Sequence, residues 1–150
     1  MTSILTFEQD AVPRALKAQV LAILEVAWPS GRSIEERLDR PLHDPRSAPV
    51  CMLLVDGEVV LAYLAIPSKV IQHAGVTYRV AGLSSVATHP DHLRHGYGGM
   101  MVVAAREWNC ARATSGDSGT ADVARAYAVS ATPNAPALQG SRDAVVTSRA

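Results

Sequence analysis

Residues 86–99 have the sequence VATHPDHLRHGYGG, and this stretch changes character twice. It begins as the end of an apolar strand, passes through a loop that contains Pro90, and becomes rich in glycine. A helix is predicted after Gly96, because apolar residues then recur at helical spacing. One face of this helix consists of Tyr97, Met101, Ala104 and Trp108.

The glycines of this stretch follow a strand and open a helix, which is the setting of a phosphate site. Glycine lets the backbone approach a ligand closely. The first turn of a helix offers unpaired N–H groups at a positive dipole end. We therefore expect a pyrophosphate group here, with Arg94 as a charged contact or a solvated loop residue. The third glycine of a dinucleotide fingerprint and the Gly-Lys-Ser/Thr of a nucleotide P-loop are both absent.

The sequence before this stretch predicts two helices and then three successive antiparallel strands. The first helix carries an apolar stripe and is expected to start at an Asp10 N-cap. Its stripe consists of Val12, Leu16, Val20, Ile23 and Ala27. Ser33 and Glu36 have the spacing of a capping box for a short second helix. The predicted strands are residues 50–55, 58–66 and 76–88, with turns at Asp56-Gly57 and Ala74-Gly75.

The order of these elements and the sequence of residues 86–99 resemble the GNAT superfamily of N-acetyltransferases over about residues 1–108. The resemblance implies an α/β fold with a mixed, mostly antiparallel sheet flanked by helices. It also implies transfer of an acetyl group from acetyl-CoA to a primary amine, on a small molecule or a peptide, by direct attack. The runner-up interpretation is a degenerate or truncated acyl-CoA-binding domain without turnover. A small regulatory interaction module has no positive support in the sequence.

The resemblance also assigns roles to individual residues. Strand backbone that binds the pantetheine arm matches Val86, Ala87 and Thr88. Loop amides that bind the pyrophosphate match Arg94, His95, Gly96, Tyr97, Gly98 and Gly99. A strand N–H, that of Val86 or its neighbour, would polarise the thioester carbonyl. The catalytic base stays unassigned; Ser84, Ser85 and Tyr127 are weak candidates, and ordinary strand serines and a chance tyrosine match are the alternatives.

The chain departs from the family pattern in two places. Leu93 stands where the family usually has Arg or Gln. Residues 109–150 lack the strand–helix–strand pattern that completes the acceptor site, so the C-terminal half of the fold is expected to be incomplete. Only six of these 42 residues are Val, Ile, Leu, Met, Phe, Trp or Tyr, against 25 of 59 in residues 50–108. Such a tail is expected to be poorly ordered.

The abrupt change suggests that the tail is read out of the ancestral frame, with a natural Ala-rich extension as the alternative. Without later strands, the sheet would keep an exposed edge that favours pairing with another copy of the chain.

Composition excludes several other classes of protein. The net charge is zero, which argues against a nucleic-acid-binding face held by bulk charge. No signal peptide or membrane-spanning stretch is readable, so a cytoplasmic protein is expected. Cys51 and Cys110 do not form a disulfide framework. The spacing of His89, His92 and His95 suggests a metal site, but a proline-containing loop does not fix one face, so we interpret them as solvated and expect no metal.

Overall fold

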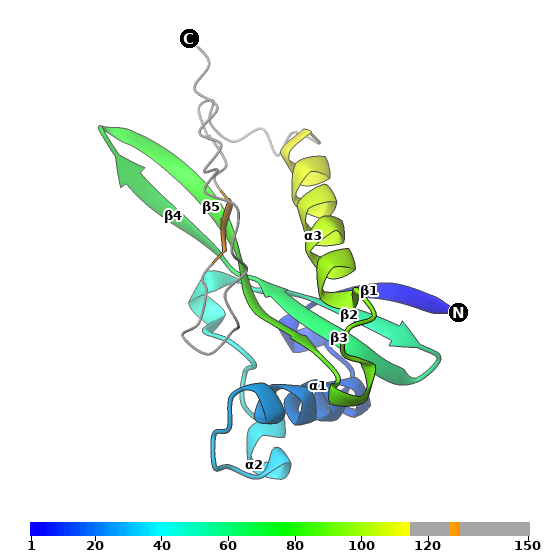
Figure 1. The fold of residues 1–150 in the computed structure, drawn as a ribbon. Coiled ribbons are helices and arrows are strands. Elements are labelled where there is room, and N and C mark those ends of the chain that lie inside the picture. Colours follow the sequence, from blue (N-terminus) through cyan, green and yellow to red (C-terminus); the bar gives the residue numbers. More distant parts are fainter. Residues whose placement is uncertain (115–126, 130–150) are drawn as a thin grey trace.

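The computed structural model describes residues 1–114 and 127–129 of the chain. These residues form one sheet with helices on both of its faces (Figure 1). The helices are α1 (Arg14–Ala27), α2 (Ile34–Leu38) and α3 (Tyr97–Thr114). Three short 3-10 turns are η1 (Gln9–Ala11), η2 (Pro45–Ser47) and η3 (Pro90–His92). The strands are β1 (Thr2–Glu8), β2 (Val50–Asp56), β3 (Val59–Ile66), β4 (Ser68–His73), β5 (Val76–Thr88) and β6 (Tyr127–Val129).

The sheet is mixed and mostly antiparallel, as predicted. Its order is β1-β2-β3-β5-β4, and β6 pairs in parallel with β5. β3 and β4 lie end to end along one edge of β5, with only Pro67 between them. The carbonyl of Pro67 accepts a hydrogen bond from Gly82 N–H of β5 (3.0 Å), so the pairing continues across the break. β4 and the first half of β5 extend from the body as a two-stranded arm (Figure 1).

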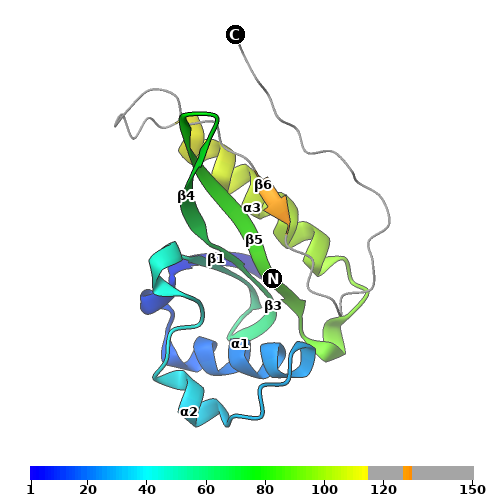
Figure 2. The ribbon, with the colours of Figure 1, turned by 90° about the vertical axis from the view of Figure 1, so that its left-hand side faces the viewer.

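Each face of the sheet packs against a different helix (Figure 2). α1 covers one face, where Val20 and Ile23 are buried against side chains such as Tyr63. α3 covers the other face, and its Met101 is completely buried. Because α1 and α3 each bury an apolar stripe against a different face, the sheet is the middle layer of a three-layer core.

Most of the predicted elements are confirmed. The strand at 76–88 has the predicted bounds. Gly57 and Gly75 have positive φ angles of 59° and 78°, as tight hairpin turns require. The capping box is present: Glu36 N–H donates to Ser33 Oγ (3.2 Å), and Ser33 N–H donates to Glu36 Oε2 (3.1 Å). The predicted apolar face of α3 also packs in the core on that side.

Other predictions were wrong in detail. Asp10 is not the N-cap of α1, because it lies in η1 and Pro13 takes that position without a side-chain bond. Ala27 is exposed, and the stripe is completed instead by Leu24. β1 and β4 were not predicted at all, since both are edge strands with many exposed positions. β6 was not predicted either, because it has only three residues and lies in the tail that was expected to lack strands.

The predicted boundary at residue 108 lies inside α3, which continues to Thr114. The predicted poor order of the tail falls largely on residues 115–126 and 130–150, which lie outside the described part.

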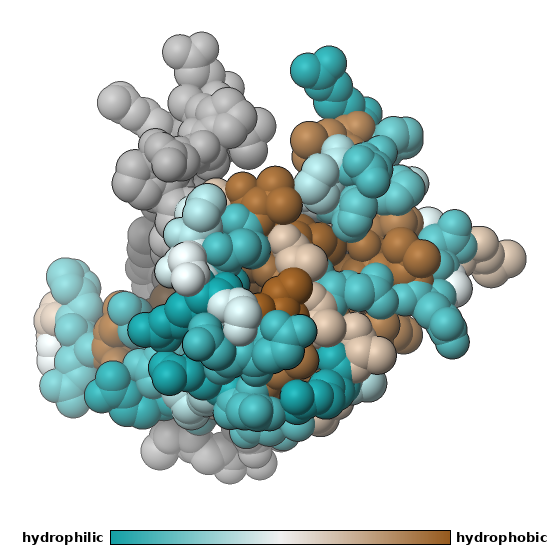
Figure 3. Space-filling view, turned by 90° about the horizontal axis from the view of Figure 1, so that it is seen from below, coloured by the Kyte–Doolittle hydropathy of each residue, from teal (hydrophilic) through white to brown (hydrophobic). Residues whose placement is uncertain are grey.

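The surface seen from below is mostly hydrophilic, with separate apolar areas set among the polar ones (Figure 3). Exposed apolar side chains in the described part include Val26 on α1 and Val59 on β3. Within that part, no helix is long and apolar enough to cross a bilayer.

Candidate functional site

A β-bulge interrupts β5 next to the glycine-rich stretch. Ala65 of β3 pairs with Ser84, whereas Tyr63 pairs with Ala87, so β5 carries one extra residue between them. Ser85 has a φ angle of 54°, which is uncommon for a residue other than glycine. The Oγ atoms of Ser84 and Ser85 are 3.4 Å apart, and both serines are half-buried. This bulge could not be predicted from the sequence, because serine is not a residue type that typically marks a left-handed backbone conformation.

Beyond the bulge, the backbone of β5 is directed alternately to its two edges. His89 N–H donates to the carbonyl of Leu61 on β3 (2.8 Å). Ala87 lies two residues earlier, so its backbone N–H and C=O groups also point to β3. The N–H and C=O groups of Val86 and Thr88 point to the opposite edge of β5.

Within the described residues, that opposite edge is covered only in part. β6 pairs with Ala81–Leu83 of β5, and no strand among residues 1–114 and 127–129 pairs with this edge from Ser84 to Thr88. Backbone donors and acceptors on an uncovered edge are available to a ligand. Of the predicted pantetheine-binding residues 86–88, Val86 and Thr88 thus present their backbone groups to the open edge, whereas Ala87 pairs with Tyr63 of β3.

The start of α3 lies directly beside this edge. Gly96 accepts the first helical hydrogen bond, from Met100 N–H (3.0 Å), so the N–H groups of the next three residues have no intrahelical acceptor. A Cβ atom on Gly98 would be 3.7 Å from Thr88 Oγ1 on β5, which shows how closely the helix start and the strand end approach. Gly96 has a φ angle of 79°. The structure therefore brings the predicted strand and loop residues into one region.

The three histidines of the connecting loop lie against one another. Ring centroids are 5.4 Å apart for His89 and His92, and 6.3 Å apart for His92 and His95. His89 Nδ1 accepts from Asp91 N–H (3.2 Å), and His95 Nδ1 lies 2.9 Å from the carbonyl oxygen of Leu93. Within the described part of the chain, no group of three or more His, Cys, Asp or Glu residues is placed to hold a metal ion.

A second group of polar residues lies in the core beneath α1 and was not predicted. His43 Nε2 is 2.7 Å from the hydroxyl oxygen of Tyr63, and that hydroxyl is 3.2 Å from Cys51 Sγ. Burial lowers the pKa of His43 and raises the pKa values of Cys51 and Tyr63. All three groups are therefore held in their neutral forms at pH 7. Cys51 and Tyr63 lie in apolar strands and His43 lies in a loop, so no local sequence pattern connects the three residues.

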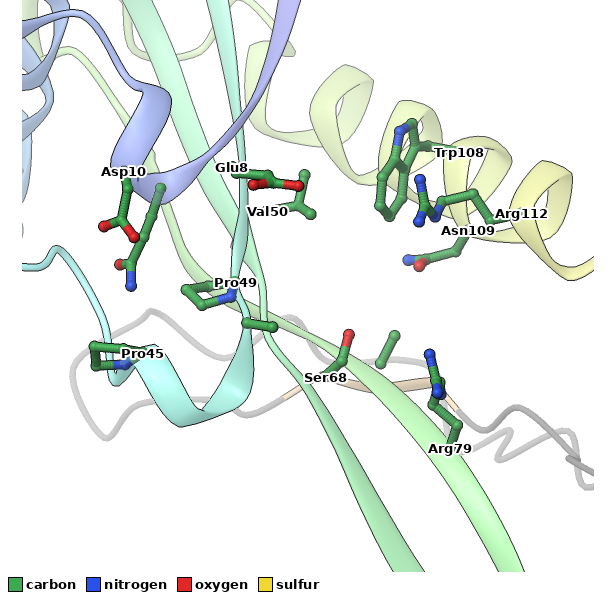
Figure 4. Close-up of a pocket in the computed structure, with 13 residues that line it drawn as sticks. Glu8, Asp10, Pro45, Pro49, Val50, Ser68, Arg79, Trp108, Asn109 and Arg112 are labelled. Atoms are coloured by element: carbon green, nitrogen blue, oxygen red, sulfur yellow. The ribbon is translucent and has the colours of Figure 1, made fainter. Parts of the chain in front are cut away.

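A cleft of about 720 Å³ opens on the α3 side of the sheet (Figure 4). Its walls come from the end of β1 and η1, the start of β2, the β4–β5 arm and the C-terminal part of α3. The charged and aromatic lining residues are Glu8, Asp10, Arg79, Trp108 and Arg112. The guanidinium carbon of Arg112 lies 4.8 Å from the ring centroid of Trp108.

The cleft and the open edge of β5 are neighbouring but separate features. Ala81 lines the cleft, and Ser84 lies three residues further along the same strand, about 10 Å away at the rise of an extended chain. None of residues 86–99 lines the cleft. Tyr127 belongs to β6 and pairs with Ala81 of β5. Its backbone therefore lies beside Ala81 and not beside Ser84 and Ser85.

Comparison with known proteins gives a match only at the level of structure. No protein-family model matches the chain, and no curated protein matches it by sequence.

Among the solved structures that are similar over most of the chain, three examples are named as acetyltransferases. The ribosomal-protein-alanine N-acetyltransferase from Brucella melitensis biovar Abortus 2308 has a TM-score of 0.62 and 13% identity, and the alignment covers 89% of this chain and 82% of that one. The glucosamine-6-phosphate N-acetyltransferase from Arabidopsis thaliana has a TM-score of 0.61 and 12% identity, with coverage of 89% and 84%. The aminoglycoside acetyltransferase HMB0005 from an uncultured soil metagenomic sample has a TM-score of 0.60 and 14% identity, with coverage of 89% and 81%. With its bulged, partly uncovered strand leading into a glycine-rich helix start, this chain therefore has the GNAT N-acetyltransferase fold.

Proposed function

We propose that this protein binds acetyl-CoA at the junction of β5 and α3 and transfers the acetyl group to a primary amine. The observation that carries the proposal is the edge of β5 at 84–88, which no described strand covers, next to N–H groups at the start of α3 that have no intrahelical acceptor. At one end of the site, the edge of β5 offers backbone hydrogen-bond donors and acceptors to the amide groups of the pantetheine part of acetyl-CoA. The other end offers backbone N–H groups and a helix dipole to a pyrophosphate.

In the proposed reaction, the neutral amine attacks the thioester carbonyl directly. A carbon–nitrogen bond forms, the carbon–sulfur bond breaks, and the sulfur leaves as a thiolate that takes up a proton. The N–H of Val86 faces the open edge, so it is suited to hold the oxygen on which negative charge develops. Ser85 and Ser84 stand one and two residues before it, where their hydroxyls could hold the water that accepts the amine's proton.

Substitution of Gly98 tests the binding site with a matched pair of variants. Gly98→Asp places a negative charge in the first turn of α3, where it favours the helix but repels a pyrophosphate. Gly98→Ala adds only a methyl group at an ordinary contact distance from Thr88. We expect calorimetry with acetyl-CoA to show a loss of affinity of about tenfold or more for the Asp variant, from charge repulsion close to the phosphates, and little change for the Ala variant. Equal affinity of Gly98→Asp and the wild type would refute the site.

The composition of residues 109–150 supports a second candidate, an acyl-CoA-binding domain without turnover. A thiol-release assay with the full chain and a panel of primary amines separates the two. Acetyl-CoA binding without release of thiol would favour the binding domain, and release that depends on the amine would establish the transferase.

A further inference from the structure

We propose that the cleft on the α3 side of the sheet is a separate binding site for a small zwitterion, with its ammonium and its acidic group at opposite ends. Nothing in the acetyl-CoA proposal requires this site, since the cleft contains none of residues 86–99. Its volume of about 720 Å³ lies in the range of small-molecule sites.

The charges of the cleft are divided between two walls. Glu8 and Asp10 come from β1 and η1 on one side, and Glu8 extends toward α3 (Figure 4). Arg79 comes from the β4–β5 arm and points toward α3 from below, and Arg112 lies on α3 itself (Figure 4). A ligand that is cationic at one end and anionic at the other matches this division, whereas a singly charged ligand matches only one wall.

The two walls are held in place by the fold. Glu8 pairs with Val50 in the sheet. The adjacent Gln9 is buried, donates its backbone N–H to the carbonyl of Pro49 (3.3 Å) and accepts from His43 N–H (3.0 Å) at its side chain. Arg79 pairs with Val70 across the arm. A site whose backbone is fixed before binding loses less entropy when a ligand arrives.

The charged groups are also available. Neither Glu8, Asp10 nor Arg79 forms an ion pair with any residue in the described part of the chain, and all three are exposed. Trp108 adds an aromatic surface between the walls (Figure 4).

The distance between the walls sets the length of the ligand. β1 and β5 are separated by β2 and β3 in the sheet, which is about 14 Å at the usual spacing of neighbouring strands. Arg79 lies a further four residues, about 13 Å, along β5 from the level of Glu8, so the two backbones are roughly 19 Å apart. Side chains reach inward from both walls, so a six-carbon zwitterion is a better fit than an α-amino acid.

The test uses three probes of equal chain length: 6-aminohexanoate, hexylamine and hexanoate. Each is titrated into the full chain without acetyl-CoA, and binding is followed by NMR at the indole N–H signal of Trp108, identified with Trp108→Phe. We expect 6-aminohexanoate to bind about 2- to 5-fold more tightly than either singly charged probe, as one additional exposed charge pair would produce. Equal binding of the three probes, or no response of the Trp108 signal, would overturn the proposal.

Three variants assign this preference to the walls. Arg79→Gln should move the affinity for 6-aminohexanoate toward that for hexylamine, and Glu8→Gln should move it toward that for hexanoate, since Arg112 and Asp10 remain on their walls. Lys69→Gln removes a positive charge from the same arm, but Lys69 pairs with Val80 and so faces the opposite side from Arg79. It should leave all three affinities unchanged. An effect of Lys69→Gln as large as that of Arg79→Gln would show that only net charge matters and would refute the site.

Discussion

The ring of His43 lies nearly parallel to the ring of Tyr63, with 6.0 Å between ring centroids, and its Nε2 shares a hydrogen bond of 2.7 Å with the tyrosine hydroxyl. His43 belongs to the loop between α2 and β2, whereas Tyr63 lies in the middle of β3 and is completely buried. This contact therefore attaches the loop to the core. Because the histidine is neutral there, the attachment depends on pH.

Stability should fall when the pH drops below about 6.5, the usual pKa of histidine. Burial lowers the pKa of His43 in the folded state, so the unfolded chain binds a proton first as the pH decreases. The stabilisation is fully present above the unfolded pKa and is lost as the pH falls toward the folded one. Urea denaturation at pH 7.5, 6.5 and 5.5 measures the effect. His43→Gln should flatten the dependence, and the same change at the exposed His73 should not.

Removing the hydroxyl of Tyr63 should destabilise the fold by about 1–3 kcal/mol, because Tyr63→Phe leaves His43 and the Cys51 thiol without their shared partner. Tyr78→Phe is the matched control, since no hydrogen bond of that hydroxyl is present in the described part. Its free energy of unfolding should change by less than about 0.5 kcal/mol. Equal effects of the two substitutions would contradict a structural role for the Tyr63 hydroxyl.

Two glycines of the phosphate loop should respond oppositely to alanine. Gly96→Ala forces a side chain into a left-handed backbone and should cost about 1–2 kcal/mol. Gly99 lies in the first turn of α3 with open space around its Cβ position, so Gly99→Ala should stabilise by up to roughly 1 kcal/mol. Thermal unfolding of both variants checks the signs. Stabilisation by Gly96→Ala would show that the backbone there is not constrained.

The contact of α3 with the sheet should be sensitive to a single side chain. Met101 is completely buried, and Met101→Ala should cost about 2–5 kcal/mol by leaving a cavity. The neighbouring Met100 is 46% exposed, and Met100→Ala should have a much smaller effect. Denaturant unfolding gives both values, and similar losses at the two positions would contradict the assigned face of α3.

Local patterns in the sequence were sufficient for the elements that depend on local chemistry. The capping box at Ser33, the turn at Gly57 and the apolar face of α3 each depend on residues within a few positions of one another. β1 and β4 escaped prediction because an edge strand owes its structure to a partner far along the chain, here β2 for β1 and β5 for β4.

The candidate sites also differ in whether their residues are close together in the sequence. The loop at 94–99 is contiguous, so its glycines and its place before a helix were visible in the sequence. The cleft assembles residues from both ends of the described chain, from Glu8 to Arg112, and only the folded sheet brings them together. The Cys51–Tyr63–His43 group likewise required the register of β2 against β3.

The bulge at Ser85 also divides β5 into two segments whose pairing registers differ by one residue. Ala81 and Leu83 face α3 before the bulge and Val86 faces it after, so the extra residue restarts the alternation of sides. Without the extra residue, Val86 would take the place of Ala87 opposite Tyr63, its side chain would face α1 and its N–H group would be directed to β3. The bulge is therefore what directs the N–H of Val86 to the edge of β5 that adjoins the glycine-rich loop.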